Sequence, residues 1–246
     1  MLLLAIDIGN TSVNFGLFRG EKLVKEWRIP TRIPPLPLGE GSRLKGVSGE
    51  GLRRVIVSSV VPRANRVIKN WFPKAKFVNH KNIGIKVKVR KPSEVGVDRL
   101  VNALAASKLY GCPAIVIDFG TATTFDVVSA KGEYLGGAIA PGILLSRDIL
   151  HERTAKLPKI KIAAPKRVIG NDTISAMQSG LVYGYVAMVE GMVQRIKSKL
   201  QNSKSKIKVV ATGGLAKLIC KHTGVVDIID PELTLKGLNL IVRRIK

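Results

Sequence analysis

Cysteine is scarce in this chain of 246 residues, and long uninterrupted apolar runs are absent. Cys112 and Cys220 are too few for a disulfide scaffold or a cysteine-rich zinc site, so we expect both to be small core residues. Charged residues interrupt every apolar stretch before it could cross a membrane. Residues 1–6 resemble the core of a signal peptide, but no basic segment precedes them and Asp7 ends the run. We therefore expect a cytoplasmic protein that does not associate with membranes.

Acidic and aromatic residues are also few. Lys and Arg number 41 against 17 Asp and Glu, which gives a formal charge of +24, and aromatic residues make up 5%. Such a charge is typical of nucleic-acid-binding proteins. The basic residues are dispersed, however, and few aromatic side chains are available to stack on bases. We expect nucleic-acid binding to be non-specific at most. Hydrophobic residues make up 46%, which indicates a globular protein.

The most informative stretch is residues 4–17. An apolar run leads to Asp7 and Gly9, a short polar turn follows, and a second strand alternates apolar with small or polar residues. The pattern predicts a β-hairpin with an acidic residue at its bend. Gly9 lets a ligand approach the backbone closely, so the turn suits a phosphate tail and its metal ion. An ordinary polar hairpin has the same pattern, and the stretch alone does not distinguish the two.

The same pattern occurs a second time at residues 114–128. Asp118 stands two residues before Gly120, as Asp7 stands two residues before Gly9, and a cluster of hydroxyl residues follows. A repeated unit of this kind predicts a duplicated domain, with the two polar turns facing each other across a cleft.

With these two hairpins, the sequence resembles the superfamily of acetate and sugar kinases, actin and heat-shock chaperone ATPases. Within it, the chain resembles the type III pantothenate kinases. The further matching segments are residues 58–62, 94–99, 135–142, 177–180 and 211–214. The resemblance implies an α/β fold of duplicated ribonuclease-H-like (actin-like ATPase) domains with a cleft between them. We expect the domains to be residues 1–111 and 112–246, the second carrying a dimerisation helix.

The activity that the resemblance implies is the ATP-dependent phosphorylation of pantothenate to 4′-phosphopantothenate, the first step of coenzyme A biosynthesis. The implied cofactors are ATP, Mg²⁺ and a monovalent cation, K⁺ or NH₄⁺. The implied assembly is a cytoplasmic homodimer.

The resemblance also assigns roles to individual residues. Asp98, in the first turn of an expected helix, would be the catalytic base for the substrate hydroxyl, although an ordinary helix N-terminal acid would look the same. Asp118 would bind the monovalent cation, and Asp7 would bind Mg²⁺ through water. The nucleotide-binding residues would be Asp7, Ile8, Gly9, Asn10, Thr11, Ser12, Val13, Asn14 and Thr121. The pantothenate-binding residues would be Val89, Gly96, Val97, Asp98, Arg99 and Thr173, the last of these from the partner subunit.

Two positions depart from the family pattern. Where the family has a tyrosine and an asparagine ahead of the G-x-D-R motif, this chain has Val89 and Lys91. A kinase of the same fold acting on another small alcohol is therefore an alternative. A non-enzymatic transcription-accessory protein is a second alternative, which the +24 charge favours and the two retained hairpin aspartates oppose.

Periodicity and turn signals predict the remaining elements. A proline-rich loop is expected at residues 29–51, and Asn171 is expected to cap the longest helix, in which Gly180 and Gly184 share one face. The expected strands are at residues 21–27, 53–59, 75–78, 85–89, 207–211 and 225–229. The expected helices are at residues 62–71, 100–109, 143–152, 172–200, 215–221 and 232–245.

Overall fold

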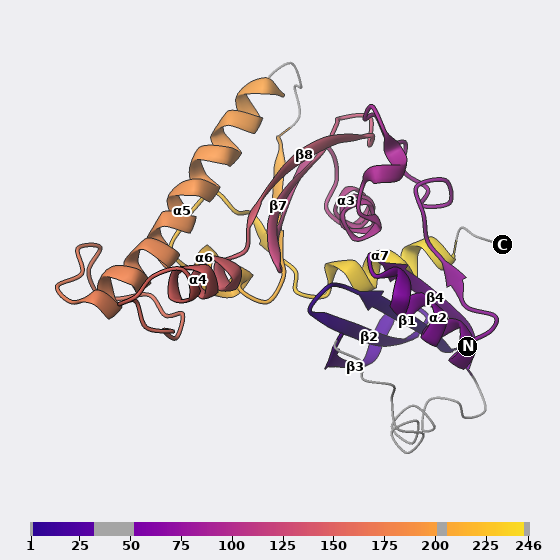
Figure 1. The fold of residues 1–246 in the computed structure, drawn as a ribbon. Coiled ribbons are helices and arrows are strands. Elements are labelled where there is room, and N and C mark those ends of the chain that lie inside the picture. Colours follow the sequence, from indigo (N-terminus) through magenta and orange to yellow (C-terminus); the bar gives the residue numbers. More distant parts are fainter. Residues whose placement is uncertain (1, 32–51, 201–205, 244–246) are drawn as a thin grey trace. The chain divides into compact units, whose positions relative to one another are not determined.

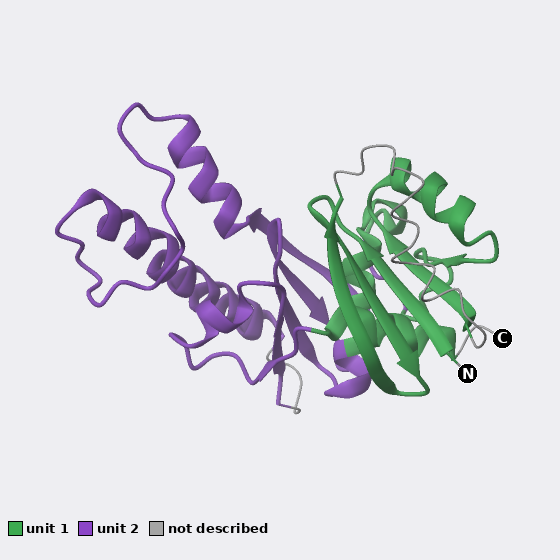
Figure 2. Ribbon diagram, turned by 90° about the horizontal axis from the view of Figure 1, so that it is seen from below, with its two compact units in different colours: residues 1–85, 90–105, 232–246 green, residues 86–89, 106–231 purple. Residues whose placement is uncertain are grey.

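The computed structural model describes residues 2–31, 52–200 and 206–243 (Figure 1). The chain forms two compact units, coloured separately in Figure 2. Unit 1 comprises Met1–Ile85, Arg90–Ala105 and Glu232–Lys246, and unit 2 comprises Lys86–Val89 and Ala106–Pro231. The C-terminal segment thus belongs with the first half of the sequence. The expected loop at residues 29–51 lies mostly outside the described residues.

The sheet of unit 1 has five strands in the order β3-β2-β1-β4-β5. β1 (Leu2–Ile8), β2 (Ser12–Arg19) and β3 (Lys22–Pro30) are joined as antiparallel neighbours. β4 (Leu52–Ser59) and β5 (Lys76–Phe77) extend the other side of β1 in parallel. The hairpin expected at residues 4–17 is confirmed.

Helices cover both faces of this sheet. α2 (Pro62–Trp71), with proline at its first position, packs Ala64 and Ile68 on alternate residues of β1 and β2. α7 (Leu233–Val242) contacts β1, β2 and β4. A methyl group at Gly237 of α7 would lie 2.7 Å from Cγ1 of Val101 in α3 (Val97–Leu109), so glycine lets the two helices pack closely. The short 3₁₀ helix η1 (Pro92–Glu94) precedes α3.

Unit 2 repeats the topology of unit 1. β6 (Ala114–Phe119), β7 (Ala122–Val128) and β8 (Tyr134–Pro141) are antiparallel neighbours. β9 (Lys208–Thr212) and β10 (Ile228–Ile229) continue in parallel on the other side of β6. The order β8-β7-β6-β9-β10 matches β3-β2-β1-β4-β5 strand for strand, which confirms the expected duplication.

The core of unit 2 lies between its sheet and three helices: α4 (Ile143–Glu152), α5 (Thr173–Lys199) and α6 (Ala216–Cys220). α5 is 27 residues long and buries an apolar stripe that includes Leu181, Val182 and Val189. Among the described residues, no helix combines the length and the hydrophobicity that crossing a membrane requires.

Two expectations about secondary structure were wrong. Residues 85–89 form no regular strand; only Val87 makes an isolated bridge, to Tyr134, although the alternation is present. The cap of α5 is Asp172 and not Asn171. The Asp172 carboxylate accepts a hydrogen bond from the Ser175 backbone N–H, and the Ser175 hydroxyl accepts one from the Asp172 N–H.

Candidate active site

Asp7 lies at the end of β1 in unit 1, next to the turn that joins β1 to β2. The turn is closed by the Gly9 N–H, which donates to the Ser12 carbonyl at 3.0 Å. The Asn14 amide of β2 donates to Asp7 Oδ2 at 3.4 Å. Asn10 and Thr11 are exposed at the tip. The bend therefore presents a carboxylate beside short polar groups.

Burial makes the Asp7 carboxyl unusually basic. Its pKa is raised from 3.8 to about 7, first by loss of solvent and second by the negative charge of Asp98. The Asn14 amide opposes the rise. A carboxylate in this state gains from a nearby cation, which would restore the ionised form. The described residues include no cluster of three or more His, Cys, Asp or Glu that could enclose a metal by themselves. A buried carboxylate with polar neighbours fits Mg²⁺, which keeps most of its water and takes its other ligands from phosphates.

Asp98 lies in the first turn of α3, as expected, and in the same unit as Asp7. Burial raises its pKa, and the backbone N–H of Arg99, which donates to Asp98 Oδ1 at 2.8 Å, opposes the rise. A methyl group at Gly96 would lie 2.6 Å from Asp98 Oδ1, so glycine leaves room for the carboxylate. A carboxylate whose pKa is moved toward neutrality, close to a second carboxylate, is suited to act as a general base.

Thr31 stabilises the turn after Asp7, a role that no sequence motif predicted. Its hydroxyl donates to the Gly9 carbonyl at 2.6 Å, and its N–H donates to the Thr11 carbonyl at 3.0 Å. Thr31 is 4% exposed and sits where the proline-rich segment begins. The contact joins residues distant in the sequence, so local pattern could not reveal it.

Three apolar residues assigned to the site have buried side chains. Ile8 and Val13 belong to the core cluster that packs against α2, and Val97 is buried at the start of α3. Only their backbone groups remain for a ligand. Lys91 is held by an ion pair with Glu94 at 2.7 Å.

In unit 2, Asp118 occupies the position that Asp7 occupies in unit 1. It ends β6 at a turn closed by the Gly120 N–H, which donates to the Ala122 carbonyl at 3.1 Å. Gly213, with φ +91°, lies beside it: a methyl group there would be 2.5 Å from Asp118 Oδ1. Close backbone around a carboxylate is suited to holding a cation with carbonyl oxygens.

The other predicted residues of unit 2 are spread along it. Thr121 is exposed at the tip of the turn, and its carbonyl accepts a hydrogen bond from the Gly142 N–H at 3.0 Å. Thr173 is the exposed first residue of α5. Val89 lies against β8, its Cγ1 3.4 Å from where a methyl group on Gly136 would be.

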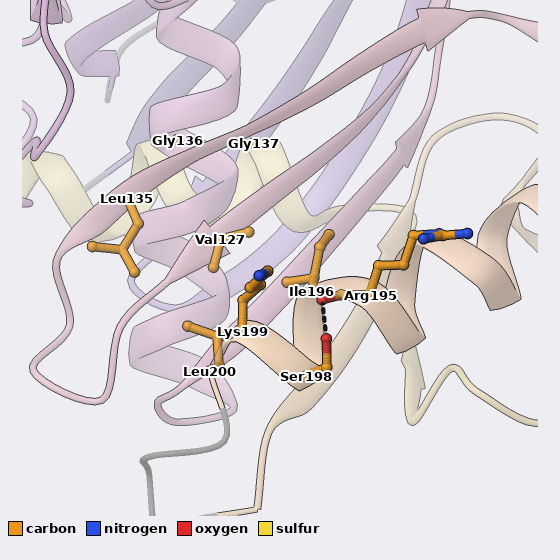
Figure 3. Close-up of a pocket in the computed structure, with 9 residues that line it drawn as sticks. All are labelled: Val127, Leu135, Gly136, Gly137, Arg195, Ile196, Ser198, Lys199 and Leu200. Atoms are coloured by element: carbon orange, nitrogen blue, oxygen red, sulfur yellow. Dashed lines mark hydrogen bonds between the residues drawn. The ribbon is translucent and has the colours of Figure 1, made fainter.

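An open cavity of about 610 Å³ lies elsewhere in unit 2 (Figure 3). β7, β8 and the end of α5 form it, and none of its lining residues is a predicted site residue. They are Val127, Leu135, Gly136, Gly137, Arg195, Ile196, Ser198, Lys199 and Leu200.

Solved structures share the fold. A protein described as a Baf family transcriptional activator from Campylobacter jejuni matches over 98% of both chains, with a TM-score of 0.65 and 20% identity. An inorganic polyphosphate/ATP-glucomannokinase from Arthrobacter sp. strain KM matches over 99% of both, with a TM-score of 0.52 and 14% identity. These identities establish the fold alone. Each unit has the sheet topology of the duplicated actin-like fold that sugar kinases share, and each carries a carboxylate at its hairpin bend.

Comparison with known sequences identifies the family within this fold. The model of the family described as type III pantothenate kinase matches residues 3–195. A type III pantothenate kinase from Dehalococcoides mccartyi is 47% identical over 251 residues, which cover 97% of this chain and 96% of the relative. One from Halalkalibacterium halodurans is 43% identical over 255 residues, covering 99% of each. The chain belongs to the type III pantothenate kinase family.

Proposed function

We propose that the protein transfers the γ-phosphoryl group of ATP to the primary alcohol of pantothenate and forms 4′-phosphopantothenate and ADP. This reaction opens coenzyme A biosynthesis and is the activity of the family to which the chain belongs. The observation that carries the proposal is the match to this family over residues 3–195, within which Asp7 and Asp98 belong to one compact unit.

Asp98 is the catalytic base in this proposal. Its carboxylate accepts the proton of the pantothenate hydroxyl as the alcohol oxygen bonds to the γ-phosphorus and the β–γ bridging oxygen leaves with ADP. Gly96 leaves space for the carboxylate, and the Arg99 N–H orients it. The protein's main task is to position the reactants and balance charge, because phosphoryl transfer needs little covalent chemistry from it.

In this proposal the turn at residues 9–14 would contact the ATP phosphates, and Asp7 would hold Mg²⁺ through a water molecule bound to the metal. The metal supplies positive charge to the phosphates when bound. Asp7 and Asn14 orient it, and Thr31 keeps the turn in place. Thr121 contributes a second phosphate contact. Asp118 binds K⁺ or NH₄⁺, which the close glycine backbone of Gly213 supports.

Residues 96–99 and Val89 bind pantothenate in this proposal, together with Thr173 of the partner subunit. Lys91 is engaged with Glu94, so its ion pair competes with any contact to the pantothenate carboxylate. Val89 supplies an apolar surface, which suits the dimethyl group next to the reacting alcohol.

We also propose a homodimer formed through α5. Ala176, Gly180, Gly184 and Ala187 form an exposed stripe of small residues along one face of this helix. Methyl groups at Gly180 and Gly184 would meet no atom within 4 Å in the described part of the chain, so packing among these residues does not require glycine there. The side chain of Ile174, near the N-terminus of α5, is 52% exposed. An apolar, small-residue face is suited to close approach by a second helix.

A substrate panel tests the proposed reaction. Purified protein with ATP, Mg²⁺ and K⁺ is given pantothenate, glycerol or a hexose, and the products are identified by mass spectrometry. We expect a phosphorylated product from pantothenate alone. Phosphorylation of another alcohol in preference to pantothenate would favour the alternative that Val89 and Lys91 suggest.

A further inference from the structure

Three polar side chains form a row across the sheet of unit 1. Asp7 of β1 is paired with Asn14 of β2 on one side and with Ser58 of β4 on the other. Directly paired residues of neighbouring strands point to the same face of a sheet. The row therefore lies on the face opposite the α2 core, to which Ile6 and Ile8 belong. Asp7 has a polar neighbour on each side.

Apart from its position beside Asp7, the Ser58 side chain has no structural role that its contacts show. Its side chain is 0% exposed, and its hydroxyl makes no hydrogen bond of ordinary geometry within the described part of the chain. Its hydroxyl nevertheless faces the Asp7 carboxylate, and this weak side-chain hydrogen bond opposes the rise in the pKa of that carboxyl. Buried hydroxyls are nearly always hydrogen-bonded, and leaving one without a partner destabilises the protein. The Ser58 hydroxyl is therefore expected to form a hydrogen bond of ordinary geometry to Asp7 once the ligand is in place.

The adjacent Ser59 shows the ordinary role of serine at this strand end. Its hydroxyl accepts a hydrogen bond from the Val61 N–H at 3.2 Å and so supports the chain where it enters α2. Ser58 and Ser59 are neighbours with the same side chain, but only Ser58 is paired with Asp7.

The second unit repeats the arrangement. Asp118 of β6 is paired with Thr124 of β7 and with Thr212 of β9, which is 2% exposed. Thr212 is therefore the counterpart of Ser58. Each acidic bend thus has a buried hydroxyl residue on the parallel strand beside it. Two occurrences in a duplicated fold indicate that the hydroxyl belongs with the carboxylate.

We propose that Ser58 is a positioning residue for the nucleotide–metal site, and that its hydroxyl hydrogen-bonds the Asp7 carboxylate when Mg²⁺ and nucleotide are bound. The inference rests on the proposed role of Asp7. A carboxylate that serves a metal needs one oxygen directed to the metal or its water, and a donor on the other oxygen fixes that orientation. Asn14, at 3.4 Å, is a long contact, and Ser58 adds the second donor. Ser58 touches neither ATP nor pantothenate in this proposal.

The test measures ADP binding by calorimetry, with and without Mg²⁺, in the wild type, Ser58→Ala and the matched control Ser59→Ala. For Ser58→Ala we expect affinity to fall about 10-fold or more in Mg²⁺, the usual effect of losing a group behind a metal ligand. Without Mg²⁺ we expect its affinity to equal that of the wild type. Its melting temperature without ligand should differ little from the wild type's, because the change removes a hydroxyl that makes no hydrogen bond of ordinary geometry. Ser58→Thr, which copies Thr212, should keep the Mg²⁺-dependent affinity.

Each other result overturns the inference in a recognisable way. Equal Mg²⁺-dependent affinities for Ser58→Ala and wild type would remove the role of Ser58 and leave the proposed nucleotide site standing. An equal loss of ADP affinity with and without Mg²⁺, or a strongly destabilised Ser58→Ala, would show that the hydroxyl has a structural role only. A wild type without any Mg²⁺-dependent ADP binding would overturn the nucleotide site itself and the role of Ser58 with it.

Discussion

Replacing Asp7 by asparagine is expected to stabilise the ligand-free protein at alkaline pH while abolishing its activity. Burial, and secondarily the charge of Asp98, raise the pKa of Asp7 from 3.8 to about 7. At about 1.4 kcal/mol per pH unit, the ionised carboxylate costs the folded protein about 4 kcal/mol. Asparagine has nearly the same shape and carries no charge. Its amide also loses solvent on burial, so we expect a net gain of about 1–3 kcal/mol at about pH 8.

The sign of the pH dependence follows from the direction of the shift. Because the folded protein holds the Asp7 proton more tightly than the unfolded chain, the wild type's free energy of unfolding falls as pH rises from about 4 to about 7. Above about pH 7, Asp7 causes no further change in the free energy of unfolding. Asp7→Asn lacks the effect, so its advantage over the wild type should be near zero at about pH 4 and complete at about pH 8.

Urea denaturation of both proteins across this pH range, without Mg²⁺ or nucleotide, measures the difference. Asp148→Asn is the control. A hydrogen bond from Arg147 lowers the pKa of Asp148, so removing that carboxylate should give no gain at high pH. A wild type more stable than Asp7→Asn at about pH 8, or a difference that does not change with pH, would refute the reasoning.

Further substitutions test the remaining parts of the account. Asp98→Asn should lower kcat by about 10²–10⁴-fold, because it removes the base, and leave ADP binding intact by calorimetry. Asp118→Asn should remove the increase in rate that K⁺ produces in the wild type, as measured by initial rates with and without K⁺. Gly213→Ala should lower the free energy of unfolding by about 2–4 kcal/mol in urea, because φ is +91° and the methyl group would meet Asp118. Gly224→Ala, with nothing within 4 Å, should change it by less than about 0.5 kcal/mol. Gly180→Leu should convert a dimer to a monomer in sedimentation experiments, because a large side chain would separate the paired helices.

Controls keep these results specific. Glu152→Gln changes an exposed acid at the end of α4 and should keep normal turnover. Asn70→Leu adds an exposed apolar side chain on α2 and should leave the oligomeric state unchanged. Normal turnover of Asp98→Asn would contradict its role as the base, and K⁺ stimulation of Asp118→Asn would contradict its role in binding the cation. Equal stability of Gly213→Ala and Gly224→Ala would contradict the close packing at Gly213. A dimeric Gly180→Leu would contradict the proposed interface on α5.

Local pattern predicted the strands and helices that build each unit. The apolar run before Asp7 and its repeat before Asp118 indicated two hairpins, and both are present with the same neighbours in their sheets. Pro62 marked the start of α2 correctly because proline is tolerated in the first turn of a helix. The alternation at residues 85–89 led to a wrong prediction of a strand. A strand needs a continuous partner, and here only Val87 makes a bridge, to Tyr134.

The supporting residues of the site could not be predicted in the same way. Thr31 holds the turn at Gly9 through contacts made only once β3 is in place. Ser58 was part of a recognised motif, but its pairing with Asp7 depends on the register of two strands separated by β2 and β3 in the sequence. α7 joins unit 1 from the far end of the chain, because its apolar residues pack on β1, β2 and β4. Local periodicity does not predict the register of strands or the packing of helices that are distant in the sequence.

The most direct test of the account is a kinase assay that follows both products. Wild-type protein with ATP, Mg²⁺, K⁺ and pantothenate should release ADP and 4′-phosphopantothenate in equal amounts, identified by mass spectrometry, and Asp98→Asn should release both at least about 100-fold more slowly. ADP release that does not depend on pantothenate, or 4′-phosphopantothenate formed equally well by both proteins, would contradict it.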